Sequence, residues 1–597
     1  MYKDKTCGEL RTADVGKTVT LAGWVHRYRD HGGVLFIDLR DRFGLTQVVI
    51  NPGVSPDLDK VAQEVRVEWV LQVIGTVRNR PEGQNNPNLE TGEIEVLATK
   101  VNVLNTSKVL PFSINKEENT DEMVRLKYRF LDLRRERMQK NIILRHKIIK
   151  YMRDYLDARG FLEIETPILF KTTPEGARDY LVPSRIYPGQ FYALPQSPQQ
   201  LKQLLMVGGM ERYFQIARCF RDEDQRGDRQ PEFTQLDVEM SFCQRDDVLN
   251  LMEDLFTNLV KDVVPWKHIM FSPWPKLTYQ EAMDRFGCDK PDLRYGMELV
   301  NITDWVNGCG FSVFENAVKD KGHVRGINAK TCGGYSRKEL DELTEQVKLW
   351  GAHGLAYVKI SETGEVSSPF KKFVSDEKWA ELMKLMDAQN GDLLLFVADK
   401  PAVVYDCLAR LRALMADRLG LKDPNQLAFC WIVDFPLFEY LEEEGHWDAL
   451  HNPFTRPKAE DMQYLDTDPG KVRGDQYDMV LNNYEMASGS LRIHERWLQE
   501  KIFDIIGLPR EVARERFHQM MDAFEYGAPP HGGIAPGVDR FVMLMCDEPN
   551  IREVIAFPKS NAARDVMADA PSEAMPGQLE ELHLKVVLPD EKKKEQK

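Results

Sequence analysis

The first hundred residues contain five short runs of strand character, and one helical run follows the third of them. The strand runs are bounded by clusters of Gly, Pro and Asn, and they cover residues 19–26, 34–39, 45–50, 70–77 and 93–98. Between the third and the fourth, residues 57–67 carry Leu58, Val61, Ala62 and Val65 at helical spacing. This order of elements predicts a small β-barrel at the N-terminus.

Five strands with one helix after the third form the pattern of the OB-fold, a barrel that often binds single-stranded nucleic acid. Phe36 lies on the second strand run, with Arg27, Arg29 and Arg40 nearby, so its ring could stack on a base. Taken alone, an apolar residue on a barrel strand is more often a core residue. Both interpretations of Phe36 stay open at this point.

The composition restricts the class of protein. A chain of 597 residues suggests three or four domains, and 43% hydrophobic with 29% charged residues is ordinary for a globular protein. No apolar run is long enough to span a bilayer and the start has no apolar signal-peptide core, so we expect a cytoplasmic protein without a membrane partner. The nine cysteines form no CxxC pair, and we interpret them as small core residues.

The net charge of −15 argues against non-specific coating of nucleic acid, but one stretch of the chain is locally basic. Its cationic residues are Arg125, Lys127, Arg129, Arg134, Arg135, Arg137, Lys140, Arg145, Lys147 and Lys150. A solvated helix face with interspersed acids and a phosphate-binding surface are equally consistent with this stretch.

A long helix and an inserted module are predicted for the middle of the chain. Apolar residues recur at helical spacing over residues 138–159, and Gly160 follows as a typical residue just beyond a helix end. An extended segment with Pro167 comes next. Residues around 290–420 alternate between strand and helix patterns, which suggests a separate α/β module. We expect residues 590–597 to form a disordered tail.

Two strand runs at residues 213–223 and 232–240, joined by a polar loop, predict an antiparallel hairpin. Period-two alternation gives each strand one polar and one apolar face. The polar face carries Gln215, Ala217, Cys219, Arg221 and Glu223 on the first strand and Gln235, Asp237 and Glu239 on the second. A solvated outer face and a ligand platform are equally consistent with this pattern. On a ligand platform, Arg221 could give a phosphate two parallel hydrogen bonds.

A second polar cluster lies near the C-terminus. Residues 478–485 have strand character and carry Asp478 and Glu485, whose oxygens are of the type that Mg²⁺ prefers. Further on, Gly537 could let the backbone approach a nucleotide, and Arg540 could stack on a base or bind a phosphate. A lone glycine-rich turn is a weak signal. The absence of a GxxxxGK[ST] motif disfavours a P-loop ATPase.

Three of these segments, in this order, resemble the motifs of the class II aminoacyl-tRNA synthetases. Pro167 after the long helix resembles motif 1, Phe220-Arg221-Asp222-Glu223 with its loop and return strand resembles motif 2, and Gly537-Val538-Asp539-Arg540 resembles motif 3. Behind an OB-fold, this layout is similar to subclass IIb, the aspartyl, asparaginyl and lysyl enzymes. Four further segments resemble the bacterial aspartyl type: residues 173–180, residues 196–202 and 233–239, which resemble its amino-acid pocket, and the inserted module.

The resemblance implies a multidomain α+β chain with an antiparallel-sheet catalytic domain. The implied segments are an OB-fold anticodon-binding domain at 1–108, a hinge at 109–135, the catalytic domain at 136–286 and 423–562, the inserted α/β domain at 287–422 and a C-terminal extension at 563–597. Motif 1 also implies a homodimer.

The substrate implied by the resemblance is L-aspartate. Its side-chain carboxylate would be bound by Arg492 and Lys202, a planar fork and a point charge. The rest of the pocket would be Glu175, Gln199, Arg221, Asp237 and His451. Uncharged asparagine would leave the two cations unpaired, and lysine would be repelled. An asparaginyl or lysyl enzyme is the nearest alternative, and a catalytically inactive RNA-binding paralogue is another.

The resemblance also implies roles in nucleotide chemistry. Arg221, Glu223 and Arg540 would be catalytic, because they would position ATP and stabilise the charge that develops on its phosphates. The implied ATP-binding set is Arg221, Asp222, Glu223, Gln230, Glu485, Gly537, Val538, Asp539 and Arg540. Asp478 and Glu485 would hold Mg²⁺.

The implied partner is tRNA-Asp. Phe36, Gln47 and Glu95 match positions that contact the anticodon in the family, where unstacked bases are read. His31 and Gly83 resemble members that charge both tRNA-Asp and tRNA-Asn, which gives an alternative of relaxed specificity.

The chain also departs from the family pattern at two places. Asn452 follows His451 where many members have a second histidine, and Met-Ala-Ser-Gly follows Glu485 in place of a run of glycines. Both departures could alter substrate binding or loop motion, and neither removes a cation that would read a carboxylate.

Overall fold

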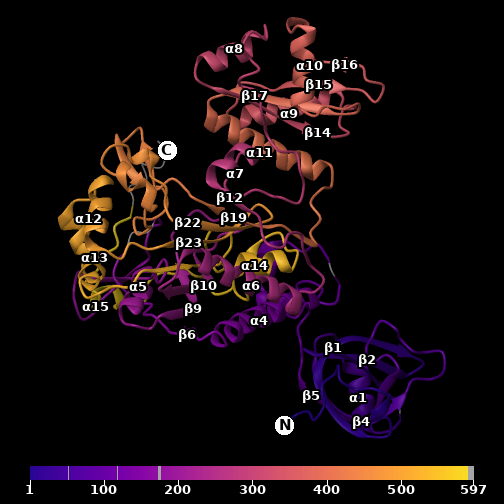
Figure 1. Cartoon of the computed structure of the whole chain (residues 1–597). Helices are drawn as coiled ribbons and strands as arrows, with labels where there is room; N and C mark the ends of the chain where they lie inside the picture. Colours follow the sequence, from indigo (N-terminus) through magenta and orange to yellow (C-terminus); the bar gives the residue numbers. More distant parts are fainter. Residues whose placement is uncertain (52, 117, 173–175, 589–597) are drawn as a thin grey trace. The chain divides into compact units, whose positions relative to one another are not determined.

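The computed structural model of the chain describes residues 1–51, 53–116, 118–172 and 176–588 (Figure 1). The chain divides into two compact units, of which one comprises Met1–Lys140 with Asp565–Ala570 and the other the remainder. The tail predicted at residues 590–597 lies outside the described residues. Within the described ranges, no helix combines the length and the apolar character needed to cross a membrane.

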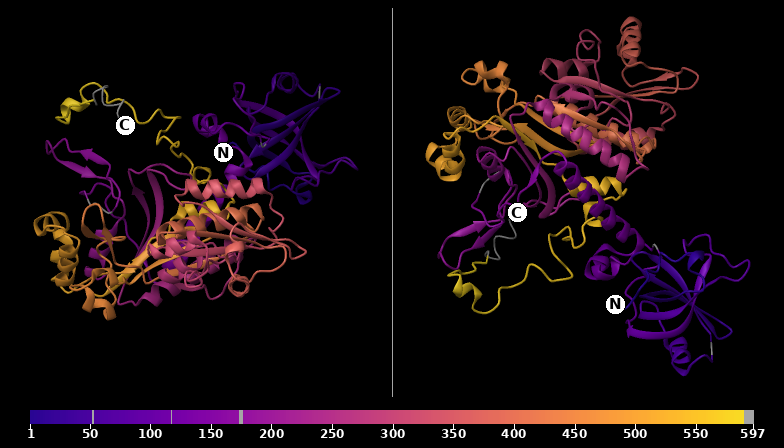
Figure 2. Two further views of the ribbon diagram at one scale, coloured as in Figure 1. Left: turned by 90° about the horizontal axis from the view of Figure 1, so that it is seen from above. Right: turned by 60° about the horizontal axis from the view of Figure 1, so that its bottom comes forward.

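The N-terminal unit contains the predicted barrel (Figures 1 and 2). Five strands close it in the order β1-β2-β3-β5-β4: β1 (Thr18–His31), β2 (Val34–Asp41), β3 (Gly44–Ile50), β5 (Ile94–Asn105) and β4 (Val70–Asn79). Helix α1 (Pro56–Glu64) follows β3, as the sequence predicts, and Pro56 begins it behind the capping side chain of Ser55. The OB-fold prediction is therefore confirmed.

Phe36 does not belong to the barrel core. Alternation along β2 buries Leu35, Ile37 and Leu39 at 2%, 0% and 0% exposure, and Phe36 projects to the other side, where it is half-buried. The interpretation of Phe36 as a core residue is wrong, because its register on the strand points it outward.

The basic stretch has a third explanation that the sequence did not suggest. Arg125, Arg129 and Arg135 are buried at 9%, 1% and 4% exposure, in and after the short helices α2 (Glu122–Lys127) and α3 (Arg129–Asp132). Their guanidinium groups lie 3.4, 2.7 and 3.7 Å from the carboxylate of Asp132, which is fully buried. These three arginines therefore form neither a solvated face nor an open phosphate surface.

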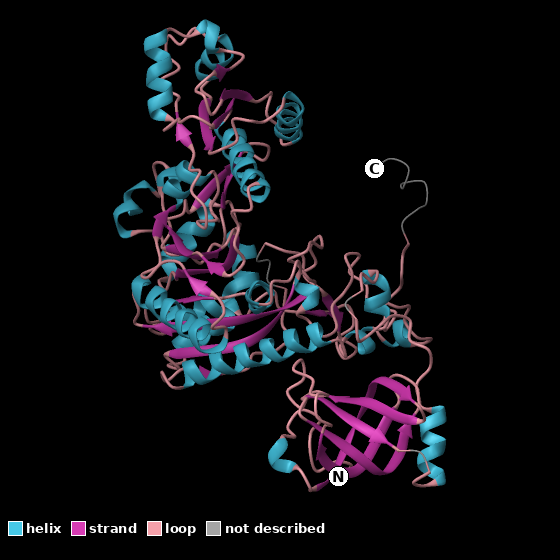
Figure 3. Ribbon diagram, turned by 90° about the vertical axis from the view of Figure 1, so that its right-hand side faces the viewer, coloured by secondary structure: helices cyan, strands magenta, loops and turns pink. Residues whose placement is uncertain are grey.

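The second unit is built on an eight-stranded sheet with the order β12-β19-β22-β23-β24-β10-β9-β6. Most of its strands are labelled in Figure 1, and Figure 3 distinguishes strands in magenta from helices in cyan. The bounds are β12 (Lys276–Thr278), β19 (Phe429–Val433), β22 (Gln476–Leu481), β23 (Tyr484–Leu491), β24 (His531–Ile534), β10 (Glu232–Ser241), β9 (Arg212–Phe220) and β6 (Leu162–Glu163). Only the outermost pair at each end is parallel. Helices α4 (Glu136–Asp157), α6 (Arg245–Val263) and α14 (Val538–Met545) pack their apolar residues against one face. The opposite face is free to carry polar groups.

One predicted strand is two strands. Residues 478–485 were expected to form a single strand, but β22 ends at Leu481 and β23 begins at Tyr484. Asn482 and Asn483 between them have φ of 49° and 72°, the left-handed pair typical of a two-residue hairpin turn. Asparagine tolerates this conformation, and the Asn482 side chain also accepts from the backbone N–H of Ala428 at 2.9 Å. The prediction missed the turn because it contains no glycine.

The inserted segment forms a three-layer module. Its sheet has the order β13-β14-β17-β15-β16: β13 (Val300–Asn301), β14 (His323–Ala329), β17 (Leu393–Asp399), β15 (Ala356–Ile360) and β16 (Val366–Ser367). Helices α9 (Arg337–Leu349) and α11 (Pro401–Arg418) pack on one face, while α8 (Ser312–Lys319) and α10 (Asp376–Leu385) pack on the other. Each face of the sheet thus has its own apolar core.

Smaller elements surround these sheets. They are α5 (Gln199–Val207), α7 (Tyr279–Phe286), α12 (Arg496–Ile505), α13 (Arg510–Phe524), α15 (Gln578–Glu581) and the strand pairs β7 (Leu181–Pro183) with β8 (Phe191–Ala193), β11 (His268–Ile269) with β18 (Gln426–Leu427) and β20 (Phe438–Leu441) with β21 (His446–Ala449). All nine cysteines are unbridged, and seven are buried while Cys288 and Cys546 are partly exposed, so the interpretation as core residues holds for most of them.

Candidate active site

The polar face of the predicted hairpin is buried. β9 and β10 pair in the expected antiparallel register, and Gln215, Asp237 and Glu239 on this face are 8%, 0% and 0% exposed. Helix α5 contacts both strands. The alternative of a solvated outer face is therefore wrong, and the charges of this face must be balanced inside the protein.

A cluster of four buried charges provides that balance. The ammonium of Lys202 lies 2.7 Å from Asp237 and 3.2 Å from Glu239, and the guanidinium of Arg492 makes two contacts with Glu239 at 3.0 and 3.2 Å. Arg492 also donates to the hydroxyl of Ser490 at 2.7 Å. Glu239 therefore joins the two cations expected to read a carboxylate. The sequence analysis placed Glu239 on the polar face and in a segment that resembles the amino-acid pocket, but it gave Glu239 no role of its own. Its partners come from α5 and from beyond β23.

The two carboxylates of this cluster differ in acidity. Burial acts to raise the pKa of Glu239, but the charges of Arg492 and Lys202 outweigh it and lower that pKa to about 2. Burial raises the pKa of Asp237 above its ordinary range, and the charge of Lys202 offsets this only in part. Glu239 is thus the firmly ionised member, and Asp237 is the carboxylate that a further positive group would stabilise.

A cavity of about 350 Å³ opens beside this cluster. The predicted site residues that line it are Gln199, Lys202, Arg221, Glu223, Gln230, Asp237, His451, Glu485, Arg492, Gly537, Asp539 and Arg540. Asp222, Asp478 and Val538 do not line it, and Glu175 lies outside the described residues. The structure therefore brings most of the predicted site residues to one cavity, from segments more than 300 residues apart in the sequence.

Three buried polar atoms in this cavity have no hydrogen-bond partner in the described part of the chain. They are Nε2 of Gln199, Nε of Arg221 and Oδ2 of Asp237. Buried polar atoms are nearly always paired in folded proteins, so their concentration at one cavity indicates that a polar ligand completes the site. The Arg221 guanidinium is held 5.1 Å from the ring centroid of Phe233, which orients it without using its donors.

The loop after β9 and the start of α14 supply further polar groups. Arg540 lies 3.0 Å from Asp228 and donates to the backbone carbonyl of Glu485 at 2.8 Å. Glu223 accepts from Arg229 at 3.3 Å. Gln230 exchanges two hydrogen bonds with the backbone of Lys559, at 2.7 and 3.1 Å. These contacts fix the cationic side chains at the cavity wall before a ligand arrives.

Three residues of the predicted nucleotide site have other partners in the structure. The carboxylate of Asp539 lies 2.5 Å from Arg145 and accepts from the backbone N–H of Thr234 at 2.7 Å, so it joins α14 to α4 and β10. The side chain of Val538 is fully buried in the apolar core. Asp222 is exposed. Gly537 precedes α14, and an added Cβ there would meet only the carbonyl oxygen of Met486, at 3.7 Å, so the backbone is open to a ligand.

The predicted metal-binding pair, Asp478 and Glu485, has a lysine beside it, because the ammonium of Lys290 lies 3.6 Å from Glu485. Glu485 lies opposite Val480 on the β22–β23 ladder, and Asp478 is two residues before Val480, so the two carboxylates share a face. Asp478 is 2% exposed, and burial followed by the charge of Glu485 raises its pKa well above the ordinary range. Within the described residues no cluster of three metal-binding side chains exists. A metal here would need phosphate and water oxygens, as Mg²⁺ commonly has.

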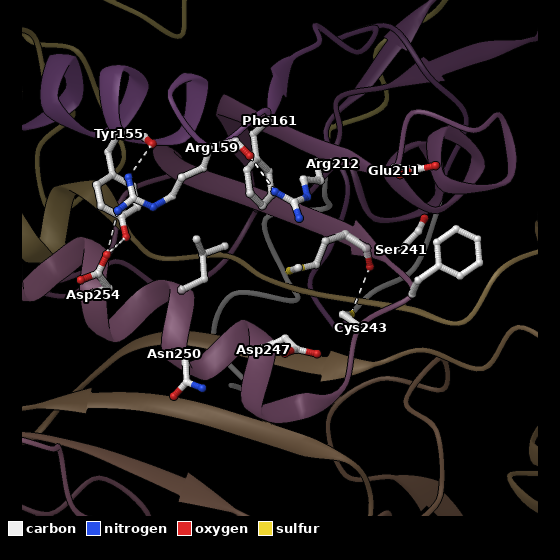
Figure 4. Close-up of a pocket in the computed structure, with 13 residues that line it drawn as sticks. Tyr155, Arg159, Phe161, Glu211, Arg212, Ser241, Cys243, Asp247, Asn250 and Asp254 are labelled. Atoms are coloured by element: carbon white, nitrogen blue, oxygen red, sulfur yellow. Dashed lines mark hydrogen bonds and ion pairs between the residues drawn. The ribbon is translucent and has the colours of Figure 1, made fainter.

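A larger cavity of about 600 Å³ lies elsewhere, beside the C-terminal end of α4 and the start of α6 (Figure 4). Two of its charged groups already pair with each other: Arg159 lies 2.9 Å from Asp254 and 3.4 Å from the ring centroid of Tyr155, whose hydroxyl also donates to Asp254. None of its lining residues is among the described residues with an unsatisfied buried polar atom. The smaller cavity is therefore the candidate active site.

The barrel presents the other predicted residues on one face. Phe36 and Gln47 project to the same side of the β2–β3 ladder, and Gln47 donates to Glu95 at 2.8 Å. Glu95 also accepts from Arg78 at 2.8 Å. His31 at the end of β1 meets the Phe36 ring edge-on, with centroids 5.9 Å apart. Gly83 is exposed in a loop with φ of 78°. These side chains thus form two contacting pairs, Phe36 with His31 and the buried Gln47 with Glu95.

Comparison with known proteins matches both regions. The family model for tRNA synthetases class II (D, K and N) matches residues 121–561, and the model for an OB-fold nucleic acid binding domain matches residues 19–104. The chain is 56% identical to the aspartate–tRNA(Asp/Asn) ligase of Rubrobacter xylanophilus, over 99% of this chain and 98% of the relative. It is also 56% identical to the enzyme of that name from Heliobacterium modesticaldum, over 98% and 96%.

Solved structures share the fold. Asparaginyl-tRNA synthetase from Pyrococcus horikoshii in complex with asparaginyl-adenylate aligns with a TM-score of 0.59 at 17% identity, covering 94% of this chain and 99% of that chain. Aspartyl-tRNA synthetase from Entamoeba histolytica aligns with a TM-score of 0.55 at 19% identity, covering 92% and 90%. At these identities the likeness concerns the architecture.

Proposed function

The chain belongs to the class II tRNA synthetases of the D, K and N group, and from that premise we propose that it activates L-aspartate with ATP and transfers it to tRNA-Asp. One observation carries the choice of amino acid. Lys202 and Arg492 lie in a buried cluster whose neighbouring cavity holds the unpaired Oδ2 of Asp237 and the unpaired Nε of Arg221. A ligand with two carboxylates and one ammonium complements that arrangement.

The charge pattern assigns each end of aspartate. Its side-chain carboxylate would accept from Lys202 and Arg492, whose positions Glu239 fixes. Its ammonium would donate to the unpaired Oδ2 of Asp237, a carboxylate whose pKa is raised by burial. Asparagine would offer both cations, which Glu239 already contacts, a neutral amide in place of a second carboxylate, which is a weaker partner in a buried site. His451 is held edge-on to Phe435 with ring centroids 5.1 Å apart, and burial lowers its pKa, so it would close the pocket as a neutral ring.

Activation then requires positioning and electrostatic stabilisation. An oxygen of the α-carboxylate attacks the α-phosphorus of ATP, the bond to the β-phosphate oxygen breaks, and diphosphate leaves with that electron pair. Arg221 would hold the attacking carboxylate and the α-phosphate together, and Arg540 would bind the phosphate tail. When bound by Asp478 and Glu485, Mg²⁺ would neutralise charge on the departing diphosphate. A ribose hydroxyl at the 3′ end of tRNA then attacks the activated carbonyl and releases AMP.

The choice of amino acid is tested by ATP–diphosphate exchange with the purified protein, which needs no tRNA. We expect exchange with aspartate and none with asparagine or lysine at the same concentration. Lys202→Met should weaken discrimination against asparagine, because it removes one of the two carboxylate-binding cations. Exchange driven by asparagine in the wild-type protein would refute the assignment, and absence of any exchange would favour an RNA-binding paralogue.

A second function, aspartylation of tRNA-Asn as well as tRNA-Asp, is supported by the names of the relatives, which specify both tRNAs. His31 lies against the ring of Phe36 on the barrel face, where it could affect how an anticodon base is accepted. Separate transcripts of tRNA-Asp and tRNA-Asn should both be charged. Charging of tRNA-Asp alone would restrict the enzyme to the first function.

A homodimer is part of the proposal. β6 ends the eight-stranded sheet, and Leu162 on it is 50% exposed, as is Leu169 in the segment that follows. An open sheet edge with apolar side chains is a common place for a second copy to bind. Light scattering after gel filtration should give twice the chain mass of 68.9 kDa, and Leu162→Arg should lower it toward one chain.

A further inference from the structure

Three phenylalanine rings of the inserted module form a stack that runs from its core to its surface. The centroids of Phe370 and Phe311 are 5.2 Å apart and those of Phe311 and Phe373 are 6.0 Å apart, with interplanar angles of 24° in both pairs. Phe370 is fully buried, Phe311 is half-buried and Phe373 is 51% exposed. Phe311 directly precedes α8 and Phe373 lies shortly before α10, both labelled in Figure 1. The stack therefore ends on an accessible aromatic ring.

Short backbone contacts hold that outer ring in place. The N–H of Phe373 donates to the carbonyl of Phe370 at 3.0 Å, and the N–H of Val374 donates to Lys371 at 3.1 Å. Gly310 has φ of 81°, and a Cβ added there would lie 2.4 Å from the carbonyl oxygen of Phe373. Only glycine allows this approach between the two segments. Because the ring is fixed in advance, a ligand that stacks on it would lose little affinity to ordering.

The exposed ring is accompanied by two free cations. The Lys372 ammonium lies 4.9 Å from the Phe373 ring centroid, and the Lys371 ammonium lies 5.5 Å from that of Trp379. Both lysines are exposed, and neither forms an ion pair with any described residue, whereas Lys330 and Lys348 of the same module pair with Asp392 and Glu345. Asp376 and Glu377 at the start of α10 reduce the positive charge of this segment. With Lys378 included, the net charge of residues 371–378 stays slightly positive.

From these observations we infer that Phe373, Lys371 and Lys372 form a docking platform for an unpaired nucleotide of the tRNA substrate. The inference rests on the proposed function, which supplies tRNA as the polyanion that the enzyme must hold. A base would stack on the Phe373 ring while Lys372 moves from the ring to a phosphate, and stacking of this kind accepts any base. An acidic peptide could use the two lysines, but it would gain little from a flat ring at the end of a stack.

The test separates tRNA binding from activation. In the full-length enzyme, Phe373→Ala should weaken binding of a tRNA-Asp transcript and raise its KM in aminoacylation about tenfold, the usual scale for loss of one base–aromatic stack. Phe373→Leu should behave like Ala, and Phe373→Trp should restore binding. The double variant Lys371→Ala/Lys372→Ala should make log Kd less steep against log salt by roughly 1.5, because two phosphate contacts are lost. Aspartate-dependent ATP–diphosphate exchange should not change in any of them.

Matched controls come from the same module. Leu349 is 78% exposed and Lys384 is exposed, and Leu349→Ala and Lys384→Ala should leave tRNA binding unaltered. Single-stranded oligoadenylate should compete for the site in the wild type more than in Phe373→Ala, and polyglutamate should not. Unchanged tRNA affinity in Phe373→Ala, or competition by polyglutamate that depends on Phe373, would overturn the inference. Failure of exchange in the wild type would instead overturn the proposed function.

Discussion

The candidate active-site cavity and the barrel face predicted to contact the anticodon carry similar polar side chains in opposite surroundings. In the cavity, Lys202, Asp237, Glu239 and Arg492 are at most 3% exposed and every charge is balanced by another buried charge. On the barrel, Gln47 and Glu95 are also paired and buried, but they stand beside the half-exposed ring of Phe36. The first arrangement suits a small charged ligand that is enclosed, and the second suits a flexible base at an open surface.

The difference has an energetic consequence. In the buried cluster beside the cavity, loss of one charge leaves another charge buried and unpaired, which costs several kcal/mol. At a half-exposed surface, water replaces the contact that is lost. A stacking contact between a base and an aromatic ring there contributes about 1–3 kcal/mol. Substitutions in the cavity should therefore have larger effects than substitutions on the barrel face.

The largest effect on catalytic activity is expected for Arg221→Ala. Removing a positioned donor that stabilises developing charge typically lowers the rate by about 10²–10³-fold, so aspartate-dependent ATP–diphosphate exchange should fall by that factor. Arg218, on the same hairpin but exposed, provides the matched control, and Arg218→Ala should retain near-normal exchange. Comparable losses in the two variants would indicate that the effect comes from the hairpin rather than from the cavity.

The next effect is expected for Glu239→Gln, which leaves Lys202 and Arg492 without their shared carboxylate. The free energy of unfolding should fall by about 3–5 kcal/mol near neutral pH. The pKa of Glu239 is lowered from 4.5 to about 2 in the folded protein. A carboxylate whose pKa is lowered in the folded state stabilises the fold at pH values above its pKa in the unfolded chain. That stabilisation is lost as the pH falls through the pKa of the folded state.

The pH dependence makes this prediction specific to Glu239. The difference in melting temperature between wild type and Glu239→Gln should be constant from pH 8 to about pH 5 and should shrink as the pH falls from 4.5 toward 2. Glu232→Gln, a half-buried position on the same strand, should show little difference at any pH. A gap that widens on acidification would contradict the assigned ionisation of Glu239.

The same residues show how much of the site could be predicted from the sequence. Alternation alone placed Gln215, Asp237 and Glu239 on one face, because a strand has only two faces and each is set by the period. Whether that face is exposed to solvent or buried depends on α5, a helix from another part of the sequence. No local sequence pattern indicates that this helix covers the face. Motif resemblance supplied the missing long-range link by associating Lys202 and Arg492 with this face before any distance was known.

The failures have equally local causes. The Asn482–Asn483 turn was missed because two asparagines can adopt left-handed backbone conformations where glycine is usually sought. The arginines around Asp132 were expected at the surface because composition gives the charge of a residue but not its partner. The interpretation of Phe36 stayed open because a shift of one residue in the register of a strand moves a side chain from the core face to the solvent face.

A smaller effect is expected on the barrel face. Phe36→Leu removes the ring but keeps an apolar side chain, so the affinity for a tRNA-Asp transcript should fall about tenfold. ATP–diphosphate exchange should be unaltered, because activation does not involve the barrel. Phe36→Tyr should retain most of the affinity, and Phe43→Leu, at an exposed position in the β2–β3 turn, serves as the control. A loss in Phe36→Leu that Phe36→Tyr does not restore would argue against stacking.

The smallest effect should come from Asn452, the residue that replaces a histidine of the family pattern. It is joined to Arg492 by a chain of polar contacts: the Thr455 hydroxyl lies 3.4 Å from Oδ1 of Asn452 and 3.1 Å from the hydroxyl of Ser490, and Arg492 donates to Ser490 at 2.7 Å. The first link is the longest and therefore the weakest. Asn452→Ala should raise the KM for aspartate about threefold with little change in kcat, because only the orientation of Arg492 is relaxed.

Thr455→Val provides the comparison that separates orientation from direct contact. It breaks the same chain one step closer to Arg492 without touching the cavity wall, so its effect on the KM for aspartate should equal or exceed that of Asn452→Ala. Thr455→Ser keeps the hydroxyl and should behave like the wild type. If Asn452→Ala raises the KM and Thr455→Val does not, Asn452 acts on the ligand directly. The cavity would then hold a neutral amide at the position where the family pattern has a second histidine.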